Sequence, residues 1–214
     1  MTEPATCVRG SVVVRDLGLT DYEPVWRDMQ RLTDARDADT ADEIWFTQHK
    51  PVFTLGLNAA REHLLAPGDI PVIQIDRGGQ VTYHGPGQLM IYPLLDIRRS
   101  GIGVRDLVTA LEQSVVDLAA VYGVQAASRT DAPGVYVAGV KLASVGLRIR
   151  RGASFHGMAL NVDVDLEPFS RINPCGFEDL EVTDLARLGA ETDLAVVREQ
   201  LLPLLLGRLG LSAD

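Results

Sequence analysis

Two residues in the second half of the chain are suited to covalent chemistry, a cysteine and a lysine. Cys175 lies in the sequence Asn173-Pro174-Cys175-Gly176, where proline and glycine predict a turn that leaves the thiol accessible. The thiolate is the reactive form, and a free cysteine has a pKa near ~8.5, so a nucleophilic cysteine at neutral pH needs a nearby cation. From the sequence alone, a merely structural cysteine is an equally good interpretation.

Lys141 is one of only two lysines in the chain, and its position suggests burial. It shares a strand face with the apolar odd-numbered residues from Ala143 to Ile149, because side chains alternate between the two faces of a strand. Lysine is rarely buried without a partner, so this placement predicts a lined pocket. Val140 and Leu142 blur the alternation, and an exposed lysine at the start of the strand is the alternative.

Two histidines have contexts that suggest a role. The same alternation puts His156 on the face of Met158, Leu160 and Val162, where a hydrogen-bonded core histidine is a better interpretation than a catalyst. His84 lies in a glycine-rich stretch and is expected to contact a ligand. No spacing of His, Cys, Asp or Glu predicts a metal site, and neither a G-x-x-x-x-G-K-[ST] nor a G-x-G-x-x-G phosphate-binding motif is present.

The glycine-rich stretch is R-G-G-Q-V-T-Y-H-G-P-G-Q at residues 77–88. Strand-like runs precede it at 71–76 and follow it at 89–96. Four glycines and one proline exclude a helix and permit tight turns and close approach of the backbone to a ligand. We therefore predict a ligand-binding loop between two buried strands, with an ordinary long surface loop as the alternative.

The composition restricts the class of protein. A chain of 214 residues with 46% hydrophobic and 23% charged residues predicts a single globular domain over residues 1–214. A net charge of −9 argues against nucleic-acid binding. The sequence contains no apolar run long enough to span a membrane, and its first residues do not have the pattern of a secretory signal. A cytoplasmic location is therefore expected. Cys7 is interpreted as structural, and a disulfide between Cys7 and Cys175 is disfavoured in a reducing compartment.

The remaining pattern predicts an α+β fold with antiparallel strands and singly inserted helices. We expect strands at 8–16, 44–48, 51–55, 135–137, 140–150 and 153–164, the last three forming an antiparallel meander. Helices are expected from a Thr20–Glu23 capping box to residue 36, over 104–122, over 183–188 and from Thr192 onward. Pro203 is expected to kink or interrupt the last helix.

Several of these motifs together resemble the octanoyl (lipoyl) transferase family. The segments that carry the resemblance are R-G-G-Q-V-T-Y-H-G-P-G-Q at 77–88, G-V-K-L-A-S-V-G at 139–146, F-H-G-M-A-L-N-V at 155–162 and N-P-C-G at 173–176. With the weaker P-V-F-T-L-G at 51–56, they cover most of residues 45–176. The resemblance implies a mixed sheet flanked by helices, like the catalytic domains of biotin and lipoate protein ligases.

The resemblance also implies roles for residues. Cys175 would hold the acyl chain as a thioester, and Lys141 would lower the pKa of that cysteine and later accept a proton. Three segments would surround the acyl group and bind substrate: Arg77, Gly78, Gly79, Gln80, Val81, Thr82, Tyr83 and His84; Ser144, Val145 and Gly146; and Gly157, Met158 and Ala159.

The implied reaction moves an octanoyl or lipoyl group from acyl carrier protein to a lysine of lipoyl domains, without a cofactor, a metal, nucleic acid or a membrane. The acceptors would be the lipoyl domains of 2-oxoacid dehydrogenase complexes and the glycine cleavage H protein. Two alternatives are an ATP-dependent lipoate–protein ligase of the same fold and a non-catalytic module that binds acyl carrier or lipoyl domains. Because acyl carrier proteins are acidic, a docking patch is expected at Arg98, Arg99, Arg148, Arg150 and Arg151, with an ordinary solvated face as the alternative.

Overall fold

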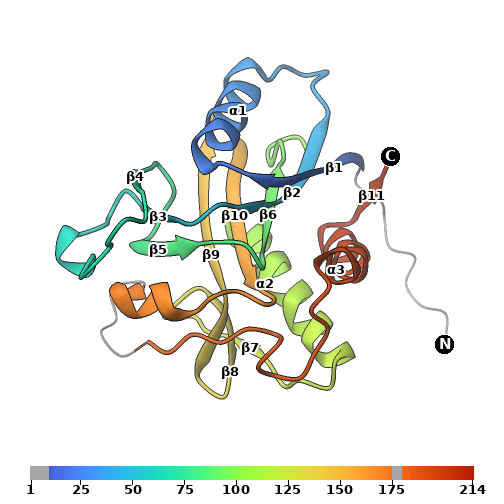
Figure 1. The fold of residues 1–214 in the computed structure, drawn as a ribbon. Helices are drawn as coiled ribbons and strands as arrows, with labels where there is room; N and C mark the ends of the chain where they lie inside the picture. The colour runs from blue at the N-terminus through green and yellow to red at the C-terminus, as the bar shows by residue number, and fades with distance from the viewer. Residues whose placement is uncertain (1–9, 175–179) are drawn as a thin grey trace.

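The computed structural model describes residues 10–174 and 180–214. In this part of the chain, an eight-stranded mixed sheet forms the centre, with strand order β11-β1-β2-β6-β10-β9-β8-β7 (Figure 1). Its strands are β1 Gly10–Thr20, β2 Asp42–His49, β6 Gln88–Leu94, β7 Ala127–Ser128, β8 Gly134–Val137, β9 Val140–Arg150, β10 Ala153–Asn161 and β11 Leu211–Ala213. The pairs β11–β1 and β1–β2 are parallel, and the others are antiparallel. The predicted α+β class and the β8–β9–β10 meander are confirmed.

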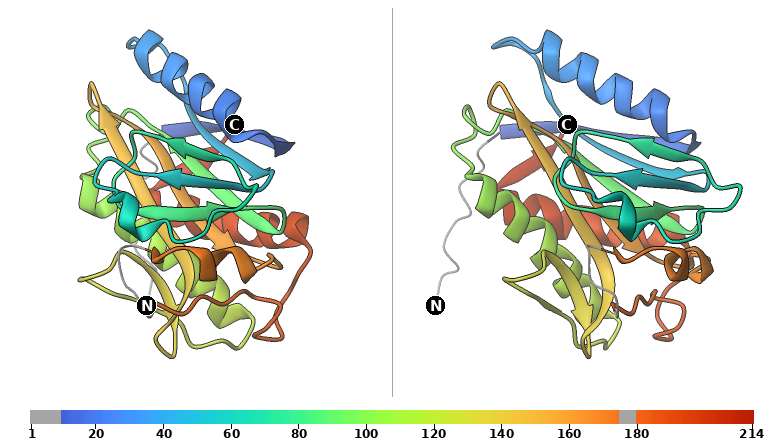
Figure 2. Two further views of the ribbon diagram at one scale, coloured as in Figure 1. Left: turned by 60° about the vertical axis from the view of Figure 1, so that its left-hand side comes forward. Right: turned by 90° about the vertical axis from the view of Figure 1, so that its left-hand side faces the viewer.

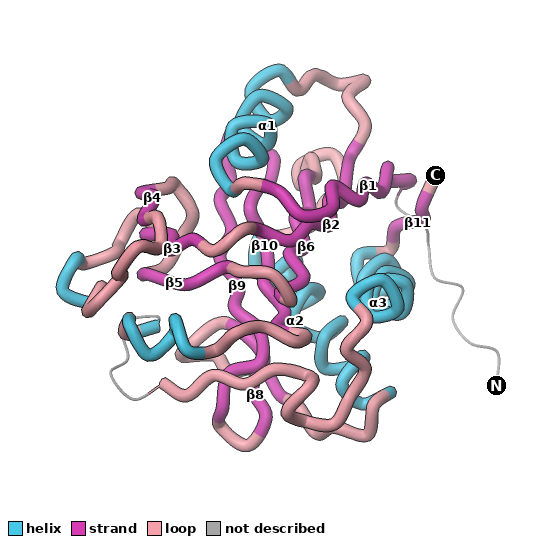
Figure 3. The backbone as a smooth tube through the Cα atoms, viewed as in Figure 1, coloured by secondary structure: helices cyan, strands magenta, loops and turns pink. Residues whose placement is uncertain are grey.

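Helices cover both faces of this sheet. Helices α2 Val104–Val121 and α3 Leu194–Leu209 pack on one face and enclose the main apolar core. Helix α1 Tyr22–Ala35 packs on the other face (Figure 3). Its buried side chains meet those of β2, β6 and β10. The apolar stripes seen in the sequence at helical spacing account for these contacts.

A second, three-stranded sheet lies on the same side as α1, with strand order β4-β3-β5. It consists of β4 Val72–Gln74, β3 Val52–Leu55 and β5 Val81–His84. Figure 2 shows it lying across β9 and β10. Its outer side packs against the short 3-10 helix Glu167–Arg171. The pocket described below lies between the two sheets.

The glycine-rich stretch differs from the predicted loop. Residues 81–84 form the strand β5 within it, paired with β3, so the stretch is a turn, a strand and a second turn. The preceding strand is also not buried on both faces, since Val72 is 42% exposed. The alternation of Val81, Thr82 and Tyr83 carries a strand signal that the surrounding glycines mask.

Two further predictions about local structure, and the predicted interruption of the last helix, were wrong. Helix α1 begins after Asp21 without a side-chain cap, because the Thr20 hydroxyl instead contacts Thr47 and His49. Residues 185–189 form turns rather than a helix. Helix α3 continues through Pro203 without interruption.

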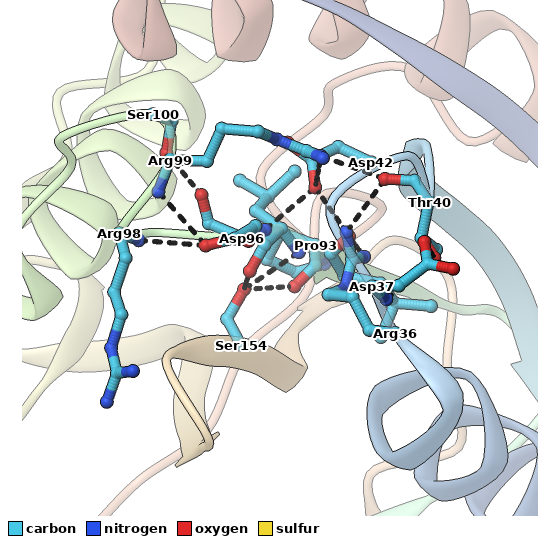
Figure 4. Close-up of polar contacts among 12 residues, drawn as sticks. Arg36, Asp37, Thr40, Asp42, Pro93, Asp96, Arg98, Arg99, Ser100 and Ser154 are labelled. Carbon is cyan, nitrogen blue, oxygen red and sulfur yellow. Dashed lines mark hydrogen bonds and ion pairs between the residues drawn. The ribbon is translucent and has the colours of Figure 1, made fainter.

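A buried ion-pair cluster lies at the start of β2, an inner strand of the large sheet (Figure 4). Asp42, the first residue of β2, accepts hydrogen bonds from the Arg36 guanidinium and the backbone N–H of Asp96, both at 2.7 Å. Arg99 forms a third contact with Asp42 at 2.9 Å. This cluster joins the end of α1 and the loop after β6 to the start of β2.

In the described part of the chain, no helix has the length and apolar composition needed to cross a membrane.

Candidate active site

A pocket lies between the small sheet and the face of β9 and β10 that α1 also covers. Its half-buried or exposed lining comes from residues 78–80, Thr82 and residues 144–146. Its deep lining is buried and comes from α1, β6, β10 and the ends of β5. The deep residues are Tyr22, Arg77, Val81, His84, Met90, Tyr92, His156, Gly157, Met158 and Ala159. The pocket is therefore entered between the 78–82 segment and β9, and it deepens toward α1 and β6.

Paired glycines permit close contacts in the wall of this pocket. Gly146 on β9 and Gly157 on β10 lie opposite each other in the register. A Cβ on Gly157 would approach the carbonyl oxygen of Ile91 to 1.9 Å, and one on Gly146 would lie 3.1 Å from the Cδ of Arg77. Glycine at both positions lets β6 and the Arg77 side chain approach the sheet closely. The glycines in G-V-K-L-A-S-V-G and F-H-G-M thus have a steric reason.

Arg77 and His84 share one hydroxyl as a hydrogen-bond partner. The Arg77 Nη2 donates to the Thr54 hydroxyl at 2.9 Å and to its carbonyl oxygen at 2.8 Å. The His84 Nε2 lies 3.2 Å from the same hydroxyl, and its Nδ1 lies 2.7 Å from the Gln88 Oε1. The amide oxygen only accepts, so Nδ1 carries the proton and donates, while Nε2 accepts from Thr54. Burial lowers the pKa of His84 well below its ordinary value, and His49 adds to this, so His84 is neutral at pH 7.

A line of hydrogen bonds leads from His84 toward the strand of Lys141. Gln88 Nε2 donates to Asn161 Oδ1 at 2.8 Å, and Asn161 Nδ2 donates to the carbonyl oxygen of Thr183 at 2.9 Å. The Thr183 N–H in turn donates to the carbonyl oxygen of Lys141 at 2.9 Å. These hydrogen bonds connect His84 of the pocket lining to Thr183 and to the backbone of Lys141.

His156 does not follow the alternation that the sequence predicts. Its φ is 57°, in the left-handed region, where a non-glycine residue in a strand is strained. Its ring stacks on that of the preceding residue, Phe155, with centroids 4.9 Å apart, so both rings lie on the α1 side of the sheet. The prediction that His156 shares a face with Met158 and Leu160 was therefore wrong. The local turn of the backbone brings its imidazole into the pocket wall.

A carboxylate holds His156 in that position. The His156 Nε2 lies 2.9 Å from Asp76 Oδ1, and its Nδ1 lies 3.4 Å from the Tyr22 hydroxyl. Trp26 Nε1 donates to the same Asp76 oxygen at 2.8 Å. Partial burial opposes ionisation of Asp76, but the hydrogen bonds from His156 and Trp26 lower its pKa to about 2. Burial lowers the pKa of His156 against the opposing effect of Asp76, so a neutral imidazole faces an ionised carboxylate at pH 7.

Lys141 is 1% exposed, which confirms the predicted burial and excludes the exposed alternative. A register shift between Val135 and Tyr136 leaves one extra residue, Leu142, on β9 and explains the blurred alternation. The Lys141 Nζ lies 5.3 Å from the centre of the Tyr136 ring, a distance at which a cation and an aromatic face attract. Lys141 lies on β9 three residues before the pocket-lining Ser144.

The neighbours of Lys141 are adapted to a buried cation. A Cβ on Gly134 would lie 2.8 Å from the Lys141 Cε, so glycine leaves space for the side chain. The Glu112 carboxylate accepts a hydrogen bond from the Gly134 N–H at 2.7 Å. Burial raises the pKa of Glu112, while that hydrogen bond and the charge of Lys141 oppose the rise.

Cys175 and Cys7 lie outside the described residues. The described chain reaches Pro174 and resumes at Leu180. On the near side, the backbone N–H of Asn173 donates to the carbonyl oxygen of His63 at 2.8 Å. On the far side, the backbone N–H of Lys141 donates to the carbonyl oxygen of Glu181 at 2.9 Å. Among the described residues, no cluster of three His, Cys, Asp or Glu side chains is arranged to hold a metal ion.

Comparison with known proteins decides the family. A family model described as the lipoyl protein ligase A/B catalytic domain matches residues 21–205. An octanoyltransferase from Hahella chejuensis is 60% identical over 189 residues, which are 88% of this chain and 84% of that protein. The chain belongs to the lipoyl protein ligase A/B family.

Solved structures show the same fold at low sequence identity. A crystal structure of lipoate–protein ligase A bound with ATP is 14% identical, with a TM-score of 0.73 over 96% of this chain and 87% of that one. The biotin protein ligase of Aquifex aeolicus is 14% identical, with a TM-score of 0.53 over 93% of this chain and 69% of that one. The predicted mixed sheet flanked by helices, resembling the catalytic domains of these ligases, is confirmed.

Within this family fold, most of the residues predicted to bind substrate line one pocket. Those of the 77–84 segment do so except Tyr83, and all six at 144–146 and 157–159 do so. Alternation along β5 turns Tyr83 to the other side, where its ring packs against Phe53 and Phe169 with centroids 5.6 and 5.5 Å away. Tyr83 is therefore the one predicted binding residue that lies outside this pocket lining.

The sequence interpretation missed four residues of the pocket lining: Tyr22, Met90, Tyr92 and His156. In the sequence, Tyr22 is interpreted as the first residue of the apolar stripe of a helix. Met90 and Tyr92 are interpreted as part of a buried strand. Alternation within β6 gave a signal for the last two, because Met90 and Tyr92 share one face with Gln88.

Proposed function

We propose that this chain transfers an octanoyl or lipoyl group from acyl carrier protein to a lysine of lipoyl domains. The acceptors would be the lipoyl domains of 2-oxoacid dehydrogenase complexes and the glycine cleavage H protein. Sequence identity of 60% to an octanoyltransferase over most of both chains supports the reaction. The observation that carries the mechanism is the burial of Lys141 next to the segment that follows Cys175 in the sequence. The backbone of Lys141 forms hydrogen bonds with the backbone of Glu181 and Thr183 in that segment.

The reaction proceeds in two steps through Cys175. The Cys175 thiolate attacks the thioester carbonyl of the donor, and the carrier leaves as its own thiolate. The neutral amine of the acceptor lysine then attacks the acyl-cysteine carbonyl, loses a proton and expels the Cys175 thiolate. One thioester replaces another in the first step, so no nucleotide is required, and the kinetics are ping-pong.

Lys141 would act in both steps. Its ammonium group, held in a site that excludes water, favours the thiolate of Cys175 and so lowers the pKa of that thiol. Once the thioester forms, that negative charge is gone, and Lys141 is the group placed to take the proton lost by the attacking amine. The two groups would therefore titrate as a coupled pair.

The pocket would hold the acyl chain of the thioester. The side chains of Met90 and Ala159, which lie on the α1 face of the sheet, give its lining an apolar part that suits a methylene chain. Backbone N–H groups around its glycines are candidates for stabilising the tetrahedral oxyanion. His84 and Thr82 would bind and position the acyl group rather than attack it.

An intact-mass experiment separates this function from its alternatives. The protein is mixed with octanoyl-acyl carrier protein without ATP, and then with a lipoyl domain. We expect a stable octanoyl adduct that disappears as the lipoyl domain gains the same mass, and no adduct with Cys175→Ala. An ATP-dependent ligase would instead modify the lipoyl domain only with free octanoate and ATP, and a binding module would give neither product.

A second experiment isolates the role of Lys141. The rate of alkylation of Cys175 by iodoacetamide is measured against pH in the parent, Lys141→Ala and Lys50→Ala. Lys50 is the other lysine of the chain and forms an exposed ion pair with Asp21 at 3.1 Å, so its variant is the matched control. We expect Lys141→Ala to slow alkylation at pH 7 about tenfold or more, because each unit of pKa changes the thiolate fraction tenfold. Identical pH profiles for Lys141→Ala and the parent would show that another group activates the cysteine.

A further inference from the structure

The deep end of the pocket is closed by aromatic side chains whose polar atoms are directed at one another. Tyr22 from the first turn of α1 and His156 from β10 lie in contact through the Tyr22 hydroxyl and the His156 Nδ1, 3.4 Å apart. Tyr92 from β6 completes this end, with its hydroxyl 2.8 Å from the His49 Nε2. All three pocket-lining side chains are buried.

This end is held rigidly from outside the pocket. The His156 Nε2–H donates to the Asp76 carboxylate. Two residues of α1 also donate to it: Trp26 to Oδ1 at 2.8 Å and Gln30 to Oδ2 at 3.3 Å. The positive φ of His156 shows that the backbone accepts strain to keep the imidazole there. Because these hydrogen bonds are made within the wall, the surfaces that Tyr22 and His156 leave for a ligand are mainly ring carbon, which suits a methyl end rather than a polar one. The charged residue of the deep lining, Arg77, is hydrogen-bonded to Thr54.

The strand register sets the distance of this wall from Lys141. Ala143 pairs with Leu160, and Leu147 pairs with His156. His156 therefore lies at one end of the stretch of β9 and β10 that lines the pocket, and Lys141 lies on β9 three residues beyond the other end. Strands rise by about 3.3 Å per residue, so the two levels are roughly 16–20 Å apart.

We propose that Tyr22 and His156 form the blind end of the acyl pocket and set the longest acyl chain that the enzyme accepts. This inference rests on the proposed function, because the acyl carbonyl must lie at the Lys141 end for its methyl end to reach the wall. Asp76 acts through His156 as a positioning residue. Chains that end before the wall bury all their methylenes, and longer chains must displace side chains held by buried hydrogen bonds.

The test compares donors that differ only in chain length. Octanoyl and tetradecanoyl thioesters of N-acetylcysteamine are offered to the parent, Tyr22→Ala and Tyr22→Phe, and the rate of acyl-enzyme formation is followed by intact mass. We expect the ratio of the tetradecanoyl to the octanoyl rate to rise at least about tenfold in Tyr22→Ala, since each methylene that fits an apolar pocket is worth a factor of roughly 10 or more. In Tyr22→Phe, which keeps the ring, the ratio should stay within about threefold of the parent.

A second variant covers the case in which Tyr22→Ala does not fold. His156→Gly opens the same end from β10, and glycine adopts the positive φ at this position without strain. It should raise the same ratio. An unchanged ratio in a folded, octanoylated variant would overturn the length-setting role while leaving the function intact. Absence of any adduct in the parent would instead overturn the proposed function.

Discussion

At the scale of single residues, the pocket region contains three buried histidines that are neutral at pH 7. Burial lowers the pKa values of His49, His84 and His156. Nearby carboxylates, Asp21 for His49 and Asp76 for His156, raise the pKa by less than burial lowers it. Neutral imidazoles leave Arg77 as the cationic side chain of the pocket lining. The buried Lys141 lies on β9, three residues before the first residue of that strand that lines the pocket.

These histidines predict a loss of stability in mild acid. Burial lowers the pKa of His49 to about 4 in the folded protein, against 6.5 in the unfolded chain. Between pH 6.5 and 4 the unfolded state therefore binds a proton that the folded state does not, so stability is present above this window and falls as the pH drops through it. For His49 alone, the free energy of unfolding should be about 2 kcal/mol lower at pH 5 than at pH 7.

Urea unfolding at the two pH values checks this. In His49→Gln, the loss of stability between pH 7 and pH 5 should be smaller than in the parent by about 2 kcal/mol, whatever the variant's stability at pH 7. An equal loss in both proteins would mean that His49 is protonated in the folded state.

At the scale of elements, the close approach of β6 to β10 depends on a glycine. A Cβ at position 157 would lie 1.9 Å from the Ile91 carbonyl oxygen and 2.8 Å from the Pro93 Cδ, and neither backbone nor proline ring is able to rotate away. We expect Gly157→Ala to lower the free energy of unfolding by about 3 kcal/mol, at the upper end of overpacking costs. Chemical denaturation measures it.

Gly207→Ala is the matched control for this change. Gly207 is an exposed residue of α3, and a Cβ there meets nothing within 4 Å. Alanine should raise stability by about 0.5–1 kcal/mol, because glycine is a poor helix former. If both alanine variants changed stability alike, the contact between β6 and β10 would not be the reason for glycine at 157.

Element patterns in the sequence were sufficient where periodicity was undisturbed. The stripes of α1 and α2 and the alternation of β8 to β10 predicted those elements and their packing. Prediction failed where a few residues leave their regular conformation. The positive φ of His156 moved one side chain to the other face, and the extra residue at Leu142 disturbed the face of β9. The pocket wall at Tyr22 depends on tertiary contacts between α1 and β10, which no local pattern contains.

At the scale of the whole molecule, the surface charge bears on how an acidic carrier protein would dock. Several arginines of the expected docking patch are engaged by the chain's own acidic residues. Arg150 forms an ion pair with the Asp34 carboxylate at 3.0 Å, Arg151 donates to the Asp34 carbonyl oxygen at 3.1 Å, and Arg99 contacts Asp42. Two of the five arginines, Arg99 and Arg150, are thus paired with carboxylates, and the net charge of −9 determines the long-range field.

This charge distribution predicts how transfer depends on salt. Two acidic proteins repel each other at low ionic strength, and salt screens that repulsion over a Debye length that falls from about 30 Å at 0.01 M to about 8 Å at 0.15 M. The KM for octanoyl-acyl carrier protein should therefore fall as salt is raised over this range. The KM for the octanoyl thioester of N-acetylcysteamine, which is uncharged, should stay constant and serves as the control. A KM for the carrier-bound donor that instead rises with salt would show that a local basic patch dominates the encounter, and charge reversal at Arg98, which lies over Gly152, would then locate that patch.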